Sequence, residues 1–293
     1  MNIRYQAFEQ KSKPVFSIII PSWNNIELLQ LCVKSIITNS KYNHQIIIHI
    51  NEGIDGTLDW VNAQQINYTH SKENIGICYA VNAAVGMAIA DYLVYINDDM
   101  YVCPDWDYYL LEEIKQLPNE YFYLSSTLIE PRFTNNNCVI APYDFGQNVN
   151  EFEEEKLLKE YQTLHFHDWT GSSWPPSVVH KHVWQMVGGY STEFSPGMYS
   201  DPDFSMKLWN AGVRYFKGIN QSRVYHFMSK STGKLRKKTN GKKQFLHKWG
   251  ISARMFYRDY LRMGSVFRGE LEEPKNSISF KLNKLKYDMK RCL

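Results

Sequence analysis

The sequence YLVYINDD, residues 92–99, joins an apolar run to three polar residues. The apolar part is short and rich in β-branched and aromatic side chains, which is typical of a buried strand. Asp98 and Asp99 follow it directly, and two neighbouring carboxylates repel each other unless a cation lies nearby. A hard divalent cation such as Mg²⁺ or Mn²⁺ prefers oxygen ligands of this kind. A solvated turn, in which Asp and Asn are common, remains the alternative at this point.

The residues before this stretch repeat the same pattern. Residues 15–20 and 45–50 are apolar runs that indicate buried strands, and residues 66–69 indicate a shorter one. Helical patterns lie between these runs, the last of them from residue 74 to about residue 90. This alternation predicts an α/β fold with a doubly wound, mostly parallel sheet, in which ligands bind beyond the carboxyl ends of the strands. The polar segments expected to converge there are residues 21–25, 51–57 and 97–99.

The second half of the chain is less regular, but it contains two candidate chemical groups. A helix is expected from Asp201 to about Ala211, followed by short strands at 214–218 and 223–227. The start of a helix favours an ionised carboxylate, so Asp201 could accept a proton there. A plain helix cap is the alternative for Asp201. His226 follows the last strand, and a structural histidine is the alternative in its case.

The composition describes a globular chain of 293 residues, with 44% hydrophobic and 22% charged residues. Its five cysteines are scattered and form no CxxC pair, so we expect neither a zinc site nor a disulfide framework, but a reducing compartment. The first 14 residues contain no apolar run, and no stretch of about 18 apolar residues occurs. We therefore expect no signal peptide and no transmembrane span.

Charge is distributed unevenly along the chain. Residues 228–293 carry 18 Lys and Arg against 5 Asp and Glu, whereas the preceding residues carry 15 against 25. Three roles are open for this basic part: contact with an anionic membrane surface, folding over the active site to hold a diphosphate, or simple solvation. Nucleic acid is not expected as a partner, because no recognition motif accompanies the charge.

Together, these motifs resemble those of the inverting family 2 glycosyltransferases of the GT-A fold. Each motif is weak alone, but six in the same order outweigh the plain alternatives for the separate residues. The resemblance covers roughly Phe16–Ser231 and implies a Rossmann-like nucleotide-binding half at 15–100 and an acceptor-binding, catalytic half at 101–227. Residues 1–14 would be an N-terminal extension and residues 228–293 a basic, helical C-terminal one. The motifs are PSWNN (21–25), NEGIDGT (51–57), ENIG (73–76), NDD (97–99), GGY (188–190) with YSDPDFSMKLWNAG (199–212), and VYHF (224–227).

The resemblance also implies roles for individual residues. Asp99 and His226 are expected to bind Mn²⁺ or Mg²⁺, and Asp201 is expected to be the general base. Asp203 is a competitor for the role of base. The residues expected to bind the nucleotide-sugar are Pro21, Trp23, Asn24, Glu52, Asp55, Asn74, Asn97 and Asp98. The residues expected near the acceptor are Trp169, Trp174, Tyr199 and Asp203.

The chain departs from the family pattern in three places. Asn97 replaces the first Asp of the D-x-D motif, and Ser200 replaces an acidic residue before Asp201. The 51–57 loop is also one residue shorter than in the family, and this leaves the role of Glu52 open.

The function predicted is metal-assisted transfer, with inversion, from a nucleoside-diphosphate sugar to a hydroxyl of a sugar or lipid-linked glycan acceptor. Polysaccharide or glycoconjugate synthesis, in the cytoplasm or at the inner face of a membrane, is the expected setting. The first alternative is a sugar nucleotidyltransferase, although PSWNN lacks the Gly and Lys that such enzymes use to hold a triphosphate. The second is a non-catalytic module that binds nucleotide-sugars.

Overall fold

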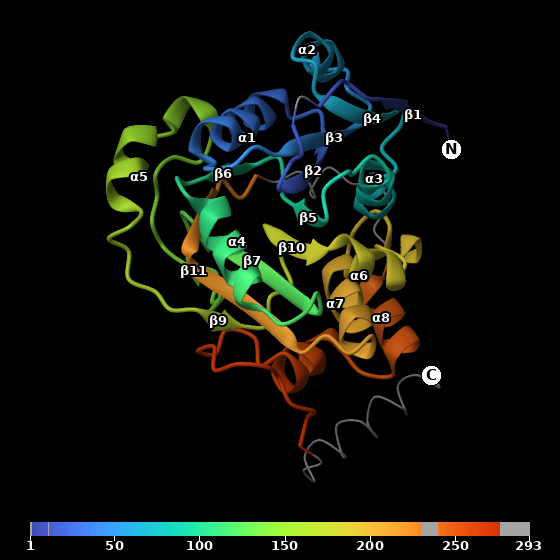
Figure 1. The fold of residues 1–293 in the computed structure, drawn as a ribbon, viewed down its shortest axis with the longest axis vertical. Helices are drawn as coiled ribbons and strands as arrows, with labels where there is room; N and C mark the ends of the chain where they lie inside the picture. The colour runs from blue at the N-terminus through green and yellow to red at the C-terminus, as the bar shows by residue number, and fades with distance from the viewer. Residues whose placement is uncertain (1, 11, 230–239, 276–293) are drawn as a thin grey trace.

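The computed structural model describes residues 2–10, 12–229 and 240–275 of the chain. Its centre is an 11-stranded sheet with the strand order β1-β4-β3-β2-β5-β10-β7-β11-β6 (Figure 1). Two short strands lie outside this order, because β8 pairs with β7 and β9 pairs with β11. The basic cluster at residues 234–238 and the residues after 275 lie outside the described part of the chain.

The strands predicted for the first half are present, and their pairing is parallel. β2 (Phe16–Trp23) lies between β3 (Gln45–Asn51) and β5 (Tyr92–Tyr95), and β4 (Asn67–Ser71) follows β3. The prediction of an α/β fold with a mostly parallel central sheet is therefore confirmed. β1 (Ile3–Gln6) pairs antiparallel with β4, so part of the predicted N-terminal extension belongs to the sheet.

The second half continues the same sheet with mixed pairing. The register of β11 against the parallel β7 shifts between Ile219 and Arg223, so the two short strands predicted at 214–218 and 223–227 are one long strand with an irregularity. β7 itself was not predicted, although all eight of its residues are buried. The strands of this half are β6 (Met100–Val102), β7 (Phe122–Ile129), β8 (Val139–Ile140), β9 (Trp169–Thr170), β10 (Ser177–His180) and β11 (Tyr215–His226).

Helices cover both faces of the sheet, as a doubly wound fold requires. Successive side chains of a strand point to opposite faces, so Ile18 packs with α1 and α4 in one core cluster while Ile19 packs with α3, α6 and α7 in the other. Figure 1 shows α6, α7 and α8 side by side on the second face. The helices are α1 (Ile26–Asn39), α2 (Thr57–Ala63), α3 (Gly76–Val85), α4 (Trp106–Gln116), α5 (Glu154–Glu160), α6 (Lys181–Met186), α7 (Ser200–Asn210), α8 (Gly241–Trp249) and α9 (Ala253–Met255), with 3₁₀ turns at Val149–Glu151 and Thr192–Phe194 and a π-helical turn at Phe256–Tyr260.

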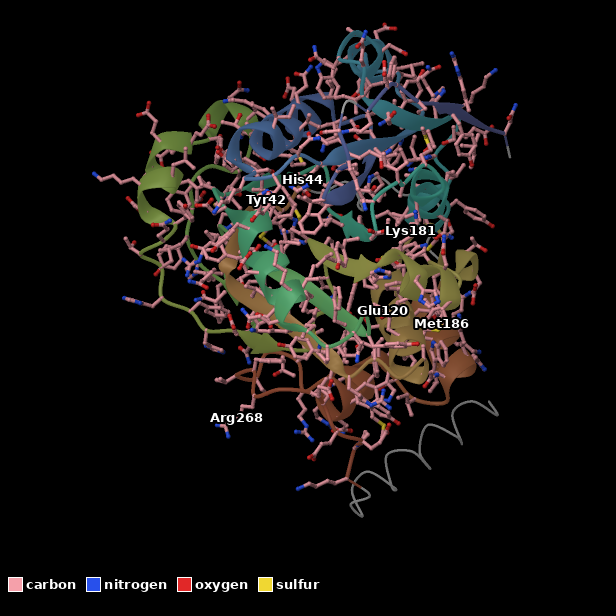
Figure 2. All side chains as sticks on the ribbon, viewed as in Figure 1. Tyr42, His44, Glu120, Lys181, Met186 and Arg268 are labelled. Atoms are coloured by element: carbon pink, nitrogen blue, oxygen red, sulfur yellow. The ribbon has the colours of Figure 1, made fainter. Side chains whose placement is uncertain are left out.

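A buried histidine–carboxylate pair docks α4 against the start of β3. His44, labelled in Figure 2, places its Nε2 2.9 Å from Asp107 Oδ2. The backbone N–H groups of Lys41 and Tyr42 also donate to Asp107, at 2.9 and 2.8 Å. Burying an ionised carboxylate costs little only when it is fully hydrogen-bonded, and these three donors meet that condition.

The described residues of the C-terminal extension pack onto the domain. Phe245, Met255 and Phe256 are buried in the same core cluster as Phe204 of α7. Residues 240–275 are therefore held by the same core as the sheet. The boundaries at residues 14, 100 and 227 stay predictions.

Candidate functional site

Residues that follow the parallel strands surround a cavity of about 310 Å³, which we call the donor cavity. Strands β2, β3 and β5 all point their carboxyl ends toward it, because parallel neighbours end at the same edge of a sheet. Seven of the predicted site residues line it. The full lining is Pro21, Ser22, Trp23, Asn51, Asn74, Gly76, Ile77, Asn97, Asp98, Asp99, Pro196, His226 and Ser229.

Asp99 is a buried carboxylate that accepts several hydrogen bonds at this cavity. Its Oδ2 accepts hydrogen bonds from the backbone N–H and the hydroxyl of Ser229, each at 2.9 Å, and lies 3.5 Å from His226 Nε2. Burial acts to raise the pKa of Asp99, but the contacts with His226 and Ser229 outweigh it and hold the pKa below its ordinary value. Asp99 is therefore set to carry a negative charge.

Asp98 has the opposite electrostatic character. Burial and the neighbouring charge of Asp99 raise the pKa of Asp98 well above its ordinary range, and the hydrogen bond from Ser22 Oγ, at 2.7 Å, offsets this only partly. A cation beside the pair would favour the ionised form of both carboxylates.

His226 ends β11 and lies between two carboxylates. Its Nδ1 is 3.0 Å from Glu130 Oε1 and its Nε2 faces Asp99. Burial lowers the pKa of His226, but the hydrogen bonds and charges of Asp99 and Glu130 prevail and raise it to about 9.

The donor set at this cavity fits a divalent cation shared with a substrate. Among the described residues, no group of three or more His, Cys, Asp and Glu side chains is placed to hold a metal ion alone. Asp99 and His226 supply two ligands. Mg²⁺ and Mn²⁺ are often held by one or two carboxylates, with substrate phosphates completing the coordination. The chemistry of the site therefore matches a cation that takes its remaining ligands from a diphosphate.

Asn74 and Gly76 of the ENIG motif (73–76) form one wall of the donor cavity. Asn74 Oδ1 accepts a hydrogen bond from the backbone N–H of Gly76 at 2.9 Å. Gly76 has a φ of 78°, and a Cβ at this position would lie 2.5 Å from the Cα of Pro196. Only glycine permits both the left-handed backbone and this approach.

Three predicted nucleotide residues form a separate loop cluster outside the lining of the donor cavity. Asn24 Nδ2 donates to Glu52 Oε2 at 2.8 Å, and Asn24 Oδ1 accepts from the backbone of Gly53 at 3.1 Å. Asp55 accepts from the backbone N–H of Ile26 at 2.9 Å and so holds the start of α1. Their roles in nucleotide binding stay predictions. Asn51, which belongs to the 51–57 segment expected at this edge but was not among the named nucleotide-binding residues, lines the cavity.

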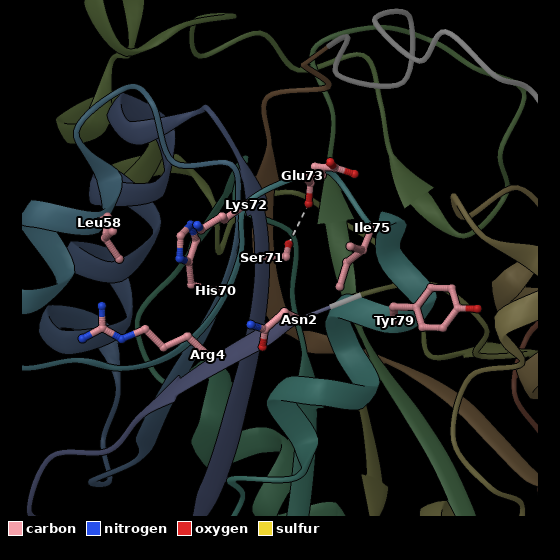
Figure 3. Close-up of a pocket in the computed structure, with 9 residues that line it drawn as sticks. All are labelled: Asn2, Arg4, Leu58, His70, Ser71, Lys72, Glu73, Ile75 and Tyr79. Atoms are coloured by element: carbon pink, nitrogen blue, oxygen red, sulfur yellow. Dashed lines mark hydrogen bonds between the residues drawn. The ribbon is translucent and has the colours of Figure 1, made fainter.

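A second cavity, of about 1060 Å³, is lined in part by the loop that connects β4 to α3 (Figure 3). Arg4 of β1 and His70 of β4 line it together with Tyr79 of α3. Ser71 Oγ donates to the backbone oxygen of Glu73 at 2.8 Å and shapes this loop, whose Asn74 lines the donor cavity. None of the predicted site residues lines this second cavity.

A third cavity, of about 1030 Å³, contains the predicted base, and we call it the acceptor cavity. Its walls come from the loop after β7, from the residues around the start of α7, and from the segment 253–263. Trp174 and Tyr257 meet there edge to face, with ring centroids 5.8 Å apart. The full lining is Glu130, Thr134, Asn135, Asn136, Asn137, Cys138, Trp174, Met198, Tyr199, Asp201, Pro202, Met228, Ala253, Arg254, Tyr257, Arg258 and Met263.

Asp201 lies in the first turn of α7. Its Oδ1 accepts a hydrogen bond from the hydroxyl of Tyr190 at 3.2 Å, and no side-chain hydrogen bond caps this helix. The plain-cap alternative for Asp201 is therefore not observed. Burial raises the pKa of Asp201 to about 7, and the hydrogen bond from Tyr190 offsets only part of this. The expectation that the helix start keeps the carboxylate fully ionised is corrected, because burial disfavours the charged form of Asp201.

Two residues predicted near the acceptor are buried in the protein instead. Asp203 is fully buried, and its Oδ1 accepts from Trp249 Nε1 at 2.8 Å and pairs with Lys248 Nζ at 2.9 Å. Trp169 is 2% exposed, and its Nε1 donates to Thr127 Oγ1 at 3.0 Å. Neither residue lines the acceptor cavity. These contacts favour an anchor for α8 in the case of Asp203, and a packing role in the case of Trp169.

Comparison with known proteins identifies the family of this chain. The sequence model of glycosyl transferase family 2 matches residues 17–173, more than half of the chain. The chain belongs to glycosyl transferase family 2, and it is a glycosyltransferase. This membership favours glycosyl transfer over the nucleotidyltransferase and the non-catalytic module.

Two polysaccharide synthases are similar in sequence. The hyaluronan synthase of Pasteurella multocida is 28% identical over 230 residues, which is 76% of this chain and 22% of that protein. The chondroitin synthase of Pasteurella multocida (strain Pm70) is 28% identical over 221 residues, 73% of this chain and 21% of that protein. The chain thus spans about a fifth of the length of these relatives.

Solved structures share the fold. Staphylococcus aureus TarS 1–349 superposes with a TM-score of 0.57 at 11% identity, covering 94% of this chain and 71% of that one. The mannosyltransferase PcManGT from Pyrobaculum calidifontis, in complex with GDP-Man and Mn²⁺, gives a TM-score of 0.52 at 14% identity, covering 84% and 64%. At such identities the likeness concerns the fold, and it confirms the GT-A class. Among the described residues, no helix has the length and apolar character needed to cross a bilayer.

Proposed function

We propose that this protein transfers a sugar from a nucleoside-diphosphate sugar to an acceptor hydroxyl, with inversion at the anomeric carbon. The observation that carries the proposal is that the donor and acceptor cavities adjoin. Ser229 lines the donor cavity and Met228 the acceptor cavity, while the hydrogen-bonded His226 and Glu130 line one each. A single displacement requires such neighbouring sites, with a base on the acceptor side and a charge-neutralising group on the donor side.

Asp201 is the proposed general base. Its carboxylate takes the hydrogen of the acceptor hydroxyl as the acceptor oxygen bonds to the anomeric carbon and the bond from that carbon to the diphosphate oxygen breaks. The hydroxyl of Tyr190 occupies Oδ1, so Oδ2 is left for the acceptor. A base whose pKa lies near the working pH is efficient, and burial places the pKa of Asp201 at about 7.

On the donor side, Asp99 and His226 would hold a divalent cation, Mn²⁺ or Mg²⁺. Such a cation supplies electrostatic stabilisation of the negative charge that develops on the departing diphosphate. Manganese accompanies the donor GDP-Man in the related PcManGT structure, which supports this cofactor.

Asn97 is proposed to contact the sugar. Tyr95 donates its hydroxyl hydrogen to Asn97 Oδ1 at 2.8 Å, so the amide nitrogen stays available toward the donor cavity. The amide nitrogen can donate a hydrogen bond to a sugar hydroxyl. An aspartate at this position could only accept a hydrogen bond from that hydroxyl. Pro21, Trp23 and Asn74 form the remaining walls, with Asn24, Glu52 and Asp55 on the nucleotide side.

The acceptor is proposed to be a glycan. Trp174 and Tyr199 offer partly exposed rings to the acceptor cavity, and sugars stack on such faces. The likeness to hyaluronan and chondroitin synthases supports a role in polysaccharide synthesis. A lipid-linked acceptor, with the basic extension on an anionic membrane surface in the cytoplasm, is the associated proposal for its setting. Sedimentation of the chain with anionic but not neutral liposomes is the result expected.

The proposal is tested by incubating the chain with a panel of UDP- and GDP-sugars, Mn²⁺ and oligosaccharide acceptors. Release of the nucleoside diphosphate together with a longer glycan is expected, and chelation should stop it. From an α-linked donor, NMR of the product should show a β linkage. Pyrophosphate release from a nucleoside triphosphate and a sugar phosphate would instead identify a nucleotidyltransferase. Donor binding without turnover would identify a binding module.

A further inference from the structure

Glu130 is a buried carboxylate that has no role in the proposed reaction so far. It follows β7, and β7 runs parallel to β11 with Ile129 paired to Tyr225. Parallel strands in this register place the next residues, Glu130 and His226, side by side at the carboxyl edge of the sheet. The sheet therefore brings together two residues that are 96 positions apart in sequence.

The main hydrogen-bond partner of the Glu130 carboxylate is His226. Glu130 is 5% exposed, and its Oε1 lies 3.0 Å from His226 Nδ1. Its other oxygen accepts only a long hydrogen bond, 3.4 Å, from the hydroxyl of Thr134. Within the described part of the chain, no lysine or arginine forms an ion pair with Glu130; the ion pair it makes is with His226.

The backbone of Glu130 is fixed on both sides. Its N–H donates to the oxygen of Ile140 at 2.9 Å, and its carbonyl oxygen accepts from the N–H of Tyr143, also at 2.9 Å. A side chain on such a rigid support can orient a partner, because little of the contact is lost to backbone motion.

We propose that Glu130 is a positioning residue that fixes the tautomer and the ring orientation of His226, so that Nε2 faces the cation held with Asp99. This inference rests on the proposed metal-assisted transfer. An ionised carboxylate can only accept hydrogen bonds, so the nitrogen beside it must carry the hydrogen. Nδ1 of His226 therefore keeps its hydrogen, and a cation that displaced the proton on Nε2 would meet the lone pair of Nε2. Carboxylates that orient metal-binding histidines in this way are common in metalloproteins.

The position of Glu130 also admits a competing role. Glu130 lines the acceptor cavity, whereas His226 lines the donor cavity. A carboxylate in the acceptor cavity could instead bind an acceptor hydroxyl directly. That role would change the KM for the acceptor, whereas the positioning role changes the affinity for the metal.

The test compares Glu130→Gln and Glu130→Ala with the control Glu154→Gln in the full chain. Glu154 also bonds a hydroxyl and a cationic side chain, those of Tyr101 and Lys34, but it lines neither cavity. Calorimetric titration with Mn²⁺, in parallel series with UDP and with GDP, gives the metal affinity. We expect the Glu130 variants to weaken Mn²⁺ binding about 10- to 100-fold, the usual effect of removing such a partner. The control and the acceptor KM should change less than about twofold.

A second measurement needs no variant. Nitrogen-15 NMR of the wild-type protein with Mg²⁺ and UDP should show His226 protonated at Nδ1 and unprotonated at Nε2. The opposite tautomer would overturn the inference, and so would unchanged Mn²⁺ affinity in folded Glu130→Gln and Glu130→Ala. If the wild type transfers sugar with Mn²⁺ while the variants bind Mn²⁺ normally, only this inference fails. If the wild type neither binds Mn²⁺ nor transfers sugar, the proposed function fails with it.

Discussion

The donor cavity takes most of its polar lining from the ends of neighbouring strands, whereas the acceptor cavity takes most of its lining from loops, from the start of α7 and from the segment after the last strand. Asn97, Asp98 and Asp99 follow β5, and their neighbours are fixed by the sheet. Trp174, Tyr199 and Tyr257 have no such common frame. In the part expected to hold the nucleotide and cation, the sheet fixes the positions of the side chains. In the part expected to hold the acceptor, their positions depend on packing between segments that are distant in sequence. Each prediction below separates the two sides.

The largest effect is expected from Asp201→Asn, on the acceptor side. An amide cannot take the proton, so turnover should fall by about 10²- to 10⁴-fold, the usual contribution of a positioned base. Donor affinity, measured by calorimetry, should stay within about twofold. Asp203→Asn is the control: it removes a buried ion pair and should lower thermal stability but spare turnover per folded molecule. Near-normal turnover of Asp201→Asn would transfer the role of base to another group.

On the donor side, Asp99→Asn should reduce turnover by about 10²- to 10³-fold, as expected when one group that stabilises developing charge is lost. The affinity for Mn²⁺ should fall with it, while binding of an oligosaccharide acceptor should not change. Chelation of the metal in the wild type should give a comparable loss that added Mn²⁺ reverses. Full activity after exhaustive chelation would contradict a metal role for Asp99.

The pH dependence of turnover should reflect the ionisation of Asp201, the proposed base on the acceptor side. Because burial raises the pKa of Asp201 to about 7, kcat/KM should rise about tenfold per pH unit below that value and level off above it. The contribution of Asp201 to the free energy of unfolding should change in the opposite direction, falling as the pH rises. A raised pKa favours the protonated folded state, so this stabilisation is present at low pH and is lost as the pH rises through about 7.

Asp201→Asn lacks this titration. Its melting temperature should therefore exceed that of the wild type by more at about pH 8 than at about pH 5. Matched thermal scans of the two proteins check this. A constant difference across that range would show that Asp201 does not titrate with a raised pKa.

The smallest effect is expected from Trp174→Ala. An aromatic contact contributes about 0.5–1.5 kcal/mol, so the KM for a glycan acceptor should rise by about 2- to 13-fold. The KM for the donor should not change. Trp184→Phe, a change in the core away from the acceptor cavity, is the control. An equal rise in both KM values would mean that the two cavities are less separate than their linings indicate.

Much of the donor side could be predicted from the sequence, because a strand ending in polar residues is a local pattern. The apolar runs before Pro21 and Asn97 predict buried strands, and the parallel sheet brings the ends of these strands together. Glu130 lines the acceptor cavity but obeys the same rule, since it follows the buried β7. It was missed because β7 was not recognised. A search of the sequence for polar residues that follow each apolar run would have found Glu130.

The acceptor side could not be predicted in the same way. Asp203 looks equivalent to Asp201 in the sequence, two positions along the same helix. Only the packing of α8, which brings Trp249 and Lys248 to Asp203, separates the two carboxylates. Trp169 and Trp174 are likewise indistinguishable until the strand β9 buries the first and the loop exposes the second.

The segment that carries Arg254, Tyr257 and Met263 has a consequence for how such enzymes diverge. It follows the last strand, and Asp203 fixes the preceding α8 to the domain. Substitutions in residues 253–263 can therefore reshape the acceptor wall while the strand ends that face the donor keep their positions. On the proposed function, a change of acceptor would then need substitutions in this segment alone and would leave the donor cavity as it is.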